Sequence, residues 1–326
     1  MHLLIIGAAG MIGRKLAERV AATGLIGGEP VDRLTLADVI EPDVAADFSG
    51  TRAAAVADLT VPGTAEQLIA DRPDVIVHLA AIVSGEAEAD FDKGYAINLD
   101  GTRALFEAVR LIEGYVPRLI YASSLAVFGA PFPDRIGDEF HLTPLTSYGT
   151  QKAVGELLLD DYSRRGFLDG IGIRFPTICI RPGKPNAAAS GFFSGILREP
   201  LNGLPAVLPV PDTLRHWHAS PRAAVGFVDH AAGLDTGLMG HRRNLTMPGV
   251  SATVADQIAA LRDVAGENAV ALIRREPDET VHGIVSGWAR DFDTRRALDL
   301  GFQAEASFRE IIHVYIEDEL DGALPS

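Results

Sequence analysis

The first thirteen residues, MHLLIIGAAGMIG (1–13), decide the fold. Leu3–Ile6 is a short apolar run, which predicts a strand buried on both faces. Directly after it, Gly7, Gly10 and Gly13 follow the spacing Gly-x-x-Gly-x-x-Gly. Residues this small allow a tight turn and let a pyrophosphate approach the N-terminus of the next helix. A tight turn with close helix packing would produce the same pattern, so the glycines need support from the rest of the chain.

Apolar strands alternate with amphipathic stretches through the first half of the chain. The expected strands are Leu3–Ile6, Arg33–Ala37, Ala53–Val56, Val75–Leu79, Arg118–Ala122 and Ile171–Phe175, and the expected helices are Met11–Ala22, Thr64–Ala70, Tyr95–Leu111 and Ser147–Tyr162. This alternation predicts an α/β fold with a doubly wound parallel sheet of the Rossmann type, covered by helices on both faces.

An acidic residue in the right place strengthens the dinucleotide interpretation. Asp38 closes the second expected strand, a little beyond the ~20 residues after the glycines at which a carboxylate reaches the ribose hydroxyls. A carboxylate there repels a 2′-phosphate and favours NAD over NADP, although Arg14 and Arg33 keep NADP open. The alternative for Asp38 is a strand-end cap. The cofactor-binding candidates from these strand ends are Gly7, Gly10, Met11, Ile12, Gly13, Asp38, Asp58, Leu59, Leu79, Ala80 and Ala81, although a lone aspartate in a loop, such as Asp58, more often forms a turn.

A second motif carries the chemistry. Tyr148 and Lys152 stand at i and i+4, on one face of an expected helix, and Ser124 follows an expected strand of the sheet. An ammonium near a phenol lowers the phenol pKa, and a tyrosine near 10 needs a drop of ~3 units, or ~4 kcal/mol, to act as a base near neutrality. A Tyr-x-x-x-Lys match alone more often reflects a surface lysine beside a packed tyrosine. The dinucleotide motif in the same chain favours the catalytic interpretation.

These motifs together resemble the extended short-chain dehydrogenases/reductases, a superfamily that includes NAD-dependent sugar-nucleotide epimerases and dehydratases. The matching residues are Gly7/Gly10/Gly13, Asp38, Asp58, His78-Leu79-Ala80-Ala81, Asn98, Ser123–Gly129, Tyr148/Lys152 and Arg174–Thr177. The resemblance implies that Ser124 holds the reacting oxygen, that Tyr148 exchanges its proton, and that Lys152 binds the nicotinamide ribose and tunes Tyr148. It further implies that Asn98 braces the active-site helix, that Pro176 and Thr177 lie beneath the nicotinamide, and that the protein is a homodimer formed through the Tyr95–Leu111 and Ser147–Tyr162 helices.

The resemblance weakens where sugar-nucleotide enzymes hold their diphosphate. There they carry Arg-Asp-aromatic-Ile-His-Val-x-Asp, whereas this chain has RHWHASPR (215–222) and keeps only an arginine and the second histidine. The chain most resembles a branch that oxidises the C2 hydroxyl of a small four-carbon sugar acid to the 2-oxo acid. Substrate candidates are Ser84, Ser123, Ser124, Asn186, Arg215 and Arg222; an arginine suits a carboxylate, although a surface ion pair or a loop cap explains the two arginines, Ser84 and Asn186 equally well.

Two other functions remain open on this sequence. A nucleotide-sugar 4-epimerase or dehydratase would use the same site and return the hydride to its substrate. A non-catalytic dinucleotide-sensing protein would not need a tuned phenol, so the serine, tyrosine and lysine argue against it.

The chain composition changes after Pro176. Residues 181–221 are rich in proline and glycine, so we expect a loop-rich segment that lines a cleft. A helix at Pro221–Leu234 and a strand at Asn244–Met247 should return to the sheet, with helices at Thr253–Val264 and Phe308–Glu319 beyond them. The expected domains are an NAD-binding Rossmann domain at 1–178, with a returning segment at about 220–248, and a smaller discontinuous substrate lobe from 179–219 and 249–326.

Bulk composition narrows the partners. The 326 residues carry a formal net charge of −15, which argues against nucleic acid or an anionic membrane as a partner. No apolar run is long enough to cross a bilayer and no basic segment precedes the first strand, so we expect a cytoplasmic protein. Cys179 is the only cysteine and should be a buried, inert core residue. No metal site is expected, because His216 and His218 lack acidic or cysteine partners at ligand spacing.

Overall fold

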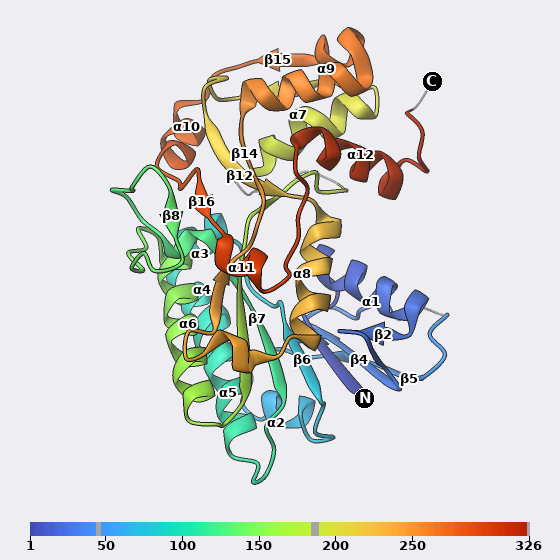
Figure 1. The fold of residues 1–326 in the computed structure, drawn as a ribbon, viewed down its shortest axis with the longest axis vertical. Coiled ribbons are helices and arrows are strands. Elements are labelled where there is room, and N and C mark those ends of the chain that lie inside the picture. Colours follow the sequence, from blue (N-terminus) through green and yellow to red (C-terminus); the bar gives the residue numbers. More distant parts are fainter. Residues whose placement is uncertain (44–46, 184–188, 325–326) are drawn as a thin grey trace.

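A computed structural model describes residues 1–43, 47–183 and 189–324 of the chain (Figure 1). Its centre is a seven-stranded sheet in the order β13-β9-β7-β6-β1-β4-β5, in which every neighbouring pair is parallel. The strands are β1 (His2–Ile6), β4 (Arg33–Asp38), β5 (Thr51–Val56), β6 (Val75–His78), β7 (Arg118–Ser124), β9 (Asp169–Phe175) and β13 (Asn244–Thr246). The predicted doubly wound Rossmann sheet is thereby confirmed, and the direction of winding reverses between β1 and β6.

Helices cover both faces of this sheet. Helices α1 (Met11–Thr23) and α8 (Pro221–Gly233) pack on one face, and α2 (Thr64–Leu68), α5 (Gly101–Arg110) and α6 (Ser147–Arg164) on the other. Successive residues of β1 explain why both faces need cover: Leu3 and Ile5 join one hydrophobic core, whereas Leu4 and Ile6 join the other. All four side chains are at most 1% exposed, as expected for a strand that is apolar on both faces.

The helix expected at Tyr95–Leu111 is not a single α-helix. It begins as a π-helical turn, η1 (Tyr95–Asp100), which continues as α5 and follows two short helices, α3 (Ser84–Ala89) and α4 (Phe91–Gly94). The wider turn contains Asn98, whose side chain is fully buried. π-Helical turns of this kind are frequent at functional sites.

A second group of elements stands beyond the carboxyl ends of the strands, at the upper end of Figure 1. Its strands are β10 (Thr177–Ile178), β11 (Ala206–Leu208), β12 (Arg215–Ala219), β14 (Val250–Thr253) and β15 (Ile273–Arg275), and its helices are α7 (Gly191–Leu201), α9 (Val254–Val270), α10 (Glu279–Ser286) and α12 (Phe308–Glu319). Strands β10, β12 and β14 form a three-stranded sheet, and α7, α9 and α12 share one hydrophobic core.

The remaining elements are short. They are β2 (Leu25–Ile26) and β3 (Glu29–Pro30), which form a hairpin; β8 (Ile136–Gly137) and β16 (Phe292–Asp293), which pair with each other; the 3-10 turns η2 (Leu125–Val127) and η3 (Thr236–Met239); and α11 (Arg295–Asp299). No helix within the described ranges is both long and apolar enough to span a membrane.

The segment 181–221 is more regular than its proline and glycine content predicts. It contains the helix α7 and the strands β11 and β12. Phe193, Ile196 and Leu197 have helical spacing and are fully buried in the core shared with α9 and α12, and Pro200 falls in the last turn of α7. Burial of this apolar face therefore prevails over the local composition. The returning helix α8 and strand β13 occur as expected, whereas the domain boundaries stay a prediction.

Candidate active site

The glycine loop after β1 rests against the end of β6. Gly7 has a φ of +91°, and a Cβ atom there would lie 2.6 Å from the backbone nitrogen of Ala80. A Cβ atom on Gly13 would lie 2.3 Å from the carbonyl oxygen of Gly7. Both positions therefore need glycine for the packing of the loop itself. The contact also brings together the two strand ends between which the winding reverses, where open α/β sheets bind their ligands.

The packing around Gly10 is less tight than that around Gly7 and Gly13. A Cβ atom there would meet only the carbonyl oxygen of Gly7, at 3.3 Å. Gly10 is also the N-cap of α1, and it provides no side-chain cap. Among the described residues, no side chain accepts a hydrogen bond from the backbone N–H groups of Met11 and Ile12. A small, uncapped helix start fits the pyrophosphate of a dinucleotide.

Asp38 is fixed beside this loop. One of its carboxylate oxygens accepts a hydrogen bond from the backbone N–H of Ala9 at 2.9 Å, and the other accepts one from Val39 at 2.7 Å. The carboxylate therefore does cap the strand end, and the same bonds hold it next to the glycine loop. Val39 and Ile40, which follow it, are 61% and 63% exposed.

The other predicted cofactor contacts lie on neighbouring strand ends. Asp58 accepts hydrogen bonds from the backbone N–H and the hydroxyl of Thr60, so it forms the turn that was the alternative for it. Leu59 packs close to Gly101 at the start of α5. Leu79 and Ala80 both donate backbone hydrogen bonds to Ile6, which continues the ladder between β6 and β1.

The predicted catalytic residues come from β7 and α6. Ser124 is the last residue of β7, and Tyr148 and Lys152 lie in the first two turns of α6. The Lys152 ammonium lies 5.8 Å from the centre of the Tyr148 ring and donates a hydrogen bond to the Ala122 carbonyl at 2.8 Å. The Ser124 hydroxyl is close enough to the Tyr148 phenol to act on its pKa. The fold thus brings together the three residues that the sequence singled out.

The electrostatics of this set follow mainly from burial. Burial raises the pKa of Tyr148, while the Ser124 hydroxyl and the positive charge of Arg181 act to lower it. Burial lowers the pKa of Lys152 to about 7, against the opposing effect of Glu156. Arg181 is therefore a second cation near the phenol, in addition to the Lys152 ammonium, which lies 5.8 Å from the centre of the Tyr148 ring. Sequence reasoning missed Arg181, because it stands in the proline-rich Arg-Pro-Gly-Lys-Pro stretch that predicted only a loop.

Asn98 links the catalytic helix to the loop after β6. Its side-chain oxygen accepts a hydrogen bond from the backbone N–H of Ile82 at 2.9 Å, and its side-chain nitrogen donates to Gln151 of α6 at 2.8 Å. Gln151 directly precedes Lys152 in the chain. This geometry suits the bracing role that the family resemblance implies.

Ser123 and Ser124 point to different surroundings, as successive residues of a strand must. The Ser123 hydroxyl donates to the Glu156 carboxylate at 2.5 Å and is part of a buried cluster with Arg174. Arg174 donates to both oxygens of Glu156, at 2.7 to 3.1 Å, and both side chains are nearly inaccessible. Ser123 is 3% exposed, so its hydroxyl serves this ion pair.

The two arginines proposed as carboxylate ligands already have partners. Arg222 forms ion pairs with Asp318 at 2.5 Å and Glu317 at 2.9 Å, both on α12. Arg215 donates to the Ser251 carbonyl at 3.0 Å and lies 3.6 Å from the Asp256 carboxylate. Both side chains are more than 40% exposed. Within the described part of the chain, neither arginine therefore contacts the Tyr148 phenol.

The other substrate candidates are placed as follows. Ser84 is the first residue of α3, whose Glu88 accepts the backbone N–H of Ser147 at the start of α6, so this short helix borders the catalytic helix. Thr177, which is a cofactor candidate, shares a hydrogen bond with the His216 ring at 2.7 Å. Asn186 lies outside the described residues.

His216 and His218 are buried in the core, and so is Cys179, as predicted for the cysteine. His216 contacts Thr177 and the Ala289 carbonyl, and His218 contacts Gln257. Burial lowers the pKa of His216 to about 4 and raises that of the fully buried Cys179 to about 12. Across residues 1–43, 47–183 and 189–324, no three His, Cys, Asp or Glu side chains are grouped so that they could hold a metal ion.

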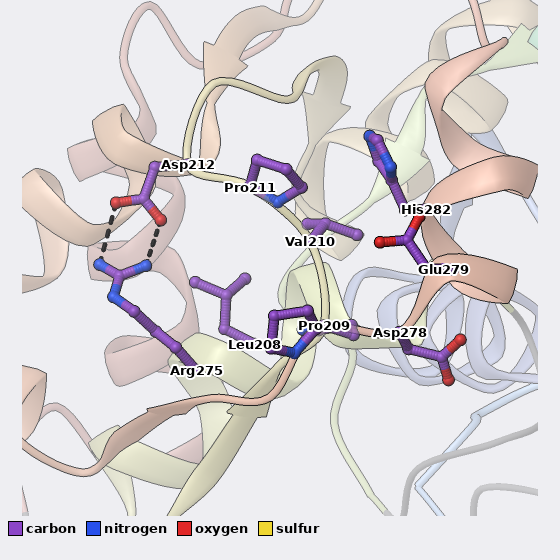
Figure 2. A pocket seen from close by; sticks show the side chains of 10 residues that line it. Leu208, Pro209, Val210, Pro211, Asp212, Arg275, Asp278, Glu279 and His282 are labelled. Carbon is purple, nitrogen blue, oxygen red and sulfur yellow. Dashed lines mark hydrogen bonds and ion pairs between the residues drawn. The ribbon is translucent and has the colours of Figure 1, made fainter.

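A separate cavity of about 240 Å³ lies in the C-terminal part of the chain, between the end of β11 and the start of α10 (Figure 2). Pro209, Val210 and Pro211 form one wall, and the ion pair between Asp212 and Arg275 lies at one side. None of the catalytic candidates lines it.

Comparison with known proteins identifies the class of protein that this fold and site define. Residues 3–218 match the model of the NAD dependent epimerase/dehydratase family, so the chain belongs to that family. It is an NAD-dependent enzyme of the extended short-chain dehydrogenase/reductase type, and the expected family membership is confirmed.

Several relatives are similar over nearly their whole length. The chain is 47% identical over 322 residues to D-erythronate dehydrogenase of Cupriavidus necator, covering 98% of each protein. It is 42% identical over 320 residues to D-erythronate dehydrogenase of Haemophilus influenzae, covering 98% of this chain and 100% of the relative. A crystal structure described as the nucleoside-diphosphate-sugar epimerase from Agrobacterium tumefaciens superposes with a TM-score of 0.98 at 66% identity, over 100% of this chain and 96% of the other. L-Threonine dehydrogenase from Clostridium difficile shares the fold, with a TM-score of 0.85 at 19% identity, over 99% of each chain.

Proposed function

We propose that this protein oxidises the C2 hydroxyl of a four-carbon sugar acid, D-erythronate, to the 2-oxo acid while NAD is reduced to NADH. The similarity to two D-erythronate dehydrogenases over 98% of this chain carries the proposal. The arrangement of Ser124, Tyr148 and Lys152 supports it, because oxidation of an alcohol needs a base for the hydroxyl proton beside the hydride acceptor.

The proposed roles follow from the positions of these side chains. Tyr148, as phenolate, takes the proton of the C2 hydroxyl, and Ser124 holds that oxygen by a hydrogen bond. Lys152 holds positive charge near the phenol and contributes to ribose binding. Bound NAD supplies the acceptor for the hydride that leaves C2. The proton is finally released to solvent, so the products are the 2-oxo acid, NADH and a proton.

The cofactor preference is also a proposal. The uncapped start of α1 at Gly10 suits the pyrophosphate, and Asp38 suits the adenosine ribose. A carboxylate at this place repels a 2′-phosphate, which favours NAD over NADP. Pro176 and Thr177, which follow the end of β9 next to Ser124, are the residues proposed to lie beneath the nicotinamide.

The strongest rival is a nucleotide-sugar epimerase or dehydratase. The name of the 66% identical structure from Agrobacterium tumefaciens favours it. Such an enzyme returns the hydride to its own substrate, so it would hold its cofactor tightly and release no net NADH. A non-catalytic dinucleotide sensor would bind NAD and turn over neither class of substrate.

The test is NADH absorbance on mixing the protein with NAD and a panel of four-carbon sugar acids, with D-erythronate and L-threonate foremost. We expect rapid NADH formation with D-erythronate and none with the Tyr148→Phe variant, which should still bind NAD with nearly unchanged affinity. Activity of Tyr148→Phe equal to wild type would refute the assigned base. If the wild-type protein forms no NADH with any acid of the panel but turns over a nucleotide sugar, the protein is a nucleotide-sugar epimerase or dehydratase.

The homodimer stays a proposal that rests on the family resemblance. Leu157, in the middle of α6, is 61% exposed, and Leu111, directly after α5, is 67% exposed, so the proposed interface helices carry uncovered apolar side chains. A second copy would cover them. A monomer at micromolar concentration in a solution mass measurement would contradict the proposal. The cytoplasmic location likewise stays a prediction.

A further inference from the structure

Arg181 stands next to the catalytic residues through the path of the main chain. Ser124, at the end of β7, pairs in register with Phe175 at the end of β9. The chain then continues through β10, and the Arg181 side chain folds back so that its Nε donates to the Ile178 carbonyl at 2.9 Å. The guanidinium is therefore anchored three residues beyond the strand position that faces Ser124.

Polar groups of α7 hold Arg181 in place. The Ser190 hydroxyl, at the start of that helix, accepts from Nη2 at 2.9 Å, and the Ser194 hydroxyl accepts the backbone N–H of Arg181 at 3.1 Å. Arg198 donates to the Arg181 carbonyl at 2.9 Å. These bonds fix the guanidinium on two sides, so its direction is set by the fold before any ligand arrives.

What Arg181 lacks is an acidic partner. Within the described ranges no Asp or Glu oxygen lies within 4 Å of its guanidinium, and its two side-chain hydrogen bonds go to neutral oxygens. Neighbouring buried arginines differ: Arg198 pairs with Glu199 at 2.5 Å, and Arg174 pairs with Glu156 at 2.7 Å. A largely buried cation without a counter-charge is costly to the fold, and such groups concentrate at functional sites.

The positive charge of Arg181 acts on the phenol of Tyr148, the proposed base. Arg181 lowers the pKa of Tyr148, and Tyr148 in turn raises that of Arg181. The acid that this enzyme is proposed to oxidise carries its carboxylate on the carbon next to the reacting C2 hydroxyl. The guanidinium is anchored to the Ile178 carbonyl, three residues beyond the β9 position that pairs with Ser124, so it lies on the side of the site where that carboxylate would extend from C2.

We propose that Arg181 binds the carboxylate of the substrate and so selects 2-hydroxy acids over neutral polyols. This inference rests on the proposed function. The guanidinium donates its remaining N–H groups to the carboxylate oxygens in a charge-assisted pair, which also fixes C2 in front of Tyr148. Arg215 and Arg222, which are exposed and already ion-paired, take no part.

The test separates recognition of the charge from catalysis. Binding of D-erythronate and of its uncharged amide, D-erythronamide, is measured by calorimetry on Tyr148→Phe protein with NAD, because that protein binds without turnover. Adding Arg181→Gln should weaken acid binding about 10- to 100-fold and change amide binding less than about 2-fold. Arg181→Lys should recover part of the loss, since it keeps the charge but not the planar fork. NAD affinity, measured on the same proteins, reports whether each variant is folded.

The matching kinetic test uses the ratio of kcat/KM for acid and amide in wild-type protein and in Arg181→Gln. Both substrates need the same base, so the ratio cancels any effect of Arg181 on the Tyr148 pKa. The ratio should fall about 10- to 100-fold. An unchanged ratio, or equal weakening of acid and amide binding, overturns the inference, as does a loss of acid binding in Arg215→Gln or Arg222→Gln in place of Arg181→Gln.

Failure of the proposed function looks different. In that case the wild-type protein forms no NADH with any acid, whatever stands at position 181. A wild-type protein that oxidises the acid while Arg181→Gln keeps the same KM and the same acid-to-amide ratio overturns only the role of Arg181.

Discussion

The Lys152 ammonium donates a hydrogen bond to the carbonyl oxygen of Ala122 at 2.8 Å and is only 2% exposed. This bond joins the catalytic helix α6 to the strand β7 two residues before Ser124. It places a cation inside the protein, 4.9 Å from the centre of the Tyr121 ring and beside the carboxylate-bearing Glu156 on the next turn of the helix. The position of the lysine is thus fixed by the fold, at a cost in desolvation.

That cost predicts a pH-dependent stability. Burial lowers the pKa of Lys152 to about 7 in the folded protein, whereas the unfolded chain keeps the ordinary value of 10.5. Between these values the unfolded state binds the extra proton, so the free energy of unfolding of wild type should rise with pH relative to Lys152→Met, by about 1.4 kcal/mol per pH unit from 7 to 10. Denaturant unfolding without added NAD at pH 7, 8 and 9 measures this, and the variant should be inactive at every pH.

The matched control is Lys93→Met. Lys93 lies on the surface beside Glu86, which raises its pKa, so it stays protonated in both states throughout this window. The difference between wild type and Lys93→Met should not change between pH 7 and 9. Parallel stability curves for wild type and Lys152→Met would show that Lys152 keeps an ordinary pKa.

Much of the fold could be predicted because burial of strands leaves a direct mark on the sequence. The apolar runs at Leu3–Ile6 and Val75–Leu79 became central strands, and Tyr148 and Lys152 lie on one helix, as their spacing requires. Helix α7 was not predicted, since its stability comes from Phe193 and Leu197 packing against helices far along the chain. The π-helical turn at Asn98 depends in the same way on contacts with Ile82 and Gln151.

The same distinction between local motifs and long-range contacts applies to the candidate site. Its residues from short local motifs, such as Gly7 and Ser124, could be identified by spacing. Arg181 could not, because its environment is set by Ser190 and Ser194 of α7 and by the pairing of β7 with β9. The ion pair of Arg222 could not be predicted either, since its partner Asp318 stands near the other end of the chain.

The three loop glycines should respond differently to alanine. Gly10→Ala meets only one atom, at 3.3 Å, so the variant should fold with a free energy of unfolding within about 1 kcal/mol of wild type and yet bind NAD at least about 10-fold more weakly. Gly13→Ala would bring its Cβ to 2.3 Å from the Gly7 carbonyl oxygen, so the free energy of unfolding should fall more in this variant than in Gly10→Ala. Thermal unfolding without NAD and calorimetry with NAD separate the two effects. Gly10→Ala with wild-type NAD affinity would argue against a pyrophosphate over this loop.

Asp38 should control the choice between NAD and NADP. Asp38→Asn removes the negative charge but keeps an oxygen that can accept the Ala9 N–H, so the loop should keep its shape. The ratio of NAD to NADP affinity should fall about 10-fold or more, because repulsion of the 2′-phosphate is lost. Fluorescence titration with both reduced cofactors measures the ratio. Equal loss of both affinities would mean that Asp38 acts only as a strand-end cap.

The buried ion pair between Glu156 and Arg174 should affect two quantities, the free energy of unfolding and the pKa of Lys152. Glu156 is 1% exposed and accepts from Ser123 as well as Arg174, so Glu156→Gln leaves a buried guanidinium with only the Asp138 carboxylate, at 3.7 Å. Loss of one partner of a buried pair costs about 3–5 kcal/mol, which denaturant unfolding would detect. Asp161→Asn, which breaks the exposed i,i+3 pair with Arg164 on the same helix, should cost less than about 0.5 kcal/mol.

The same variant tests the coupling between Glu156 and Lys152. Glu156 raises the pKa of Lys152 against the effect of burial, so Glu156→Gln should move the Lys152 pKa further down. The free energy of unfolding, measured relative to the matching protein with Lys152→Met, should therefore begin to rise at a lower pH in Glu156→Gln than in wild type. Repeating the Lys152→Met comparison in the Glu156→Gln background measures this shift. If this rise begins at the same pH in both proteins, the charge of Glu156 does not act on Lys152, because Arg174 neutralises it.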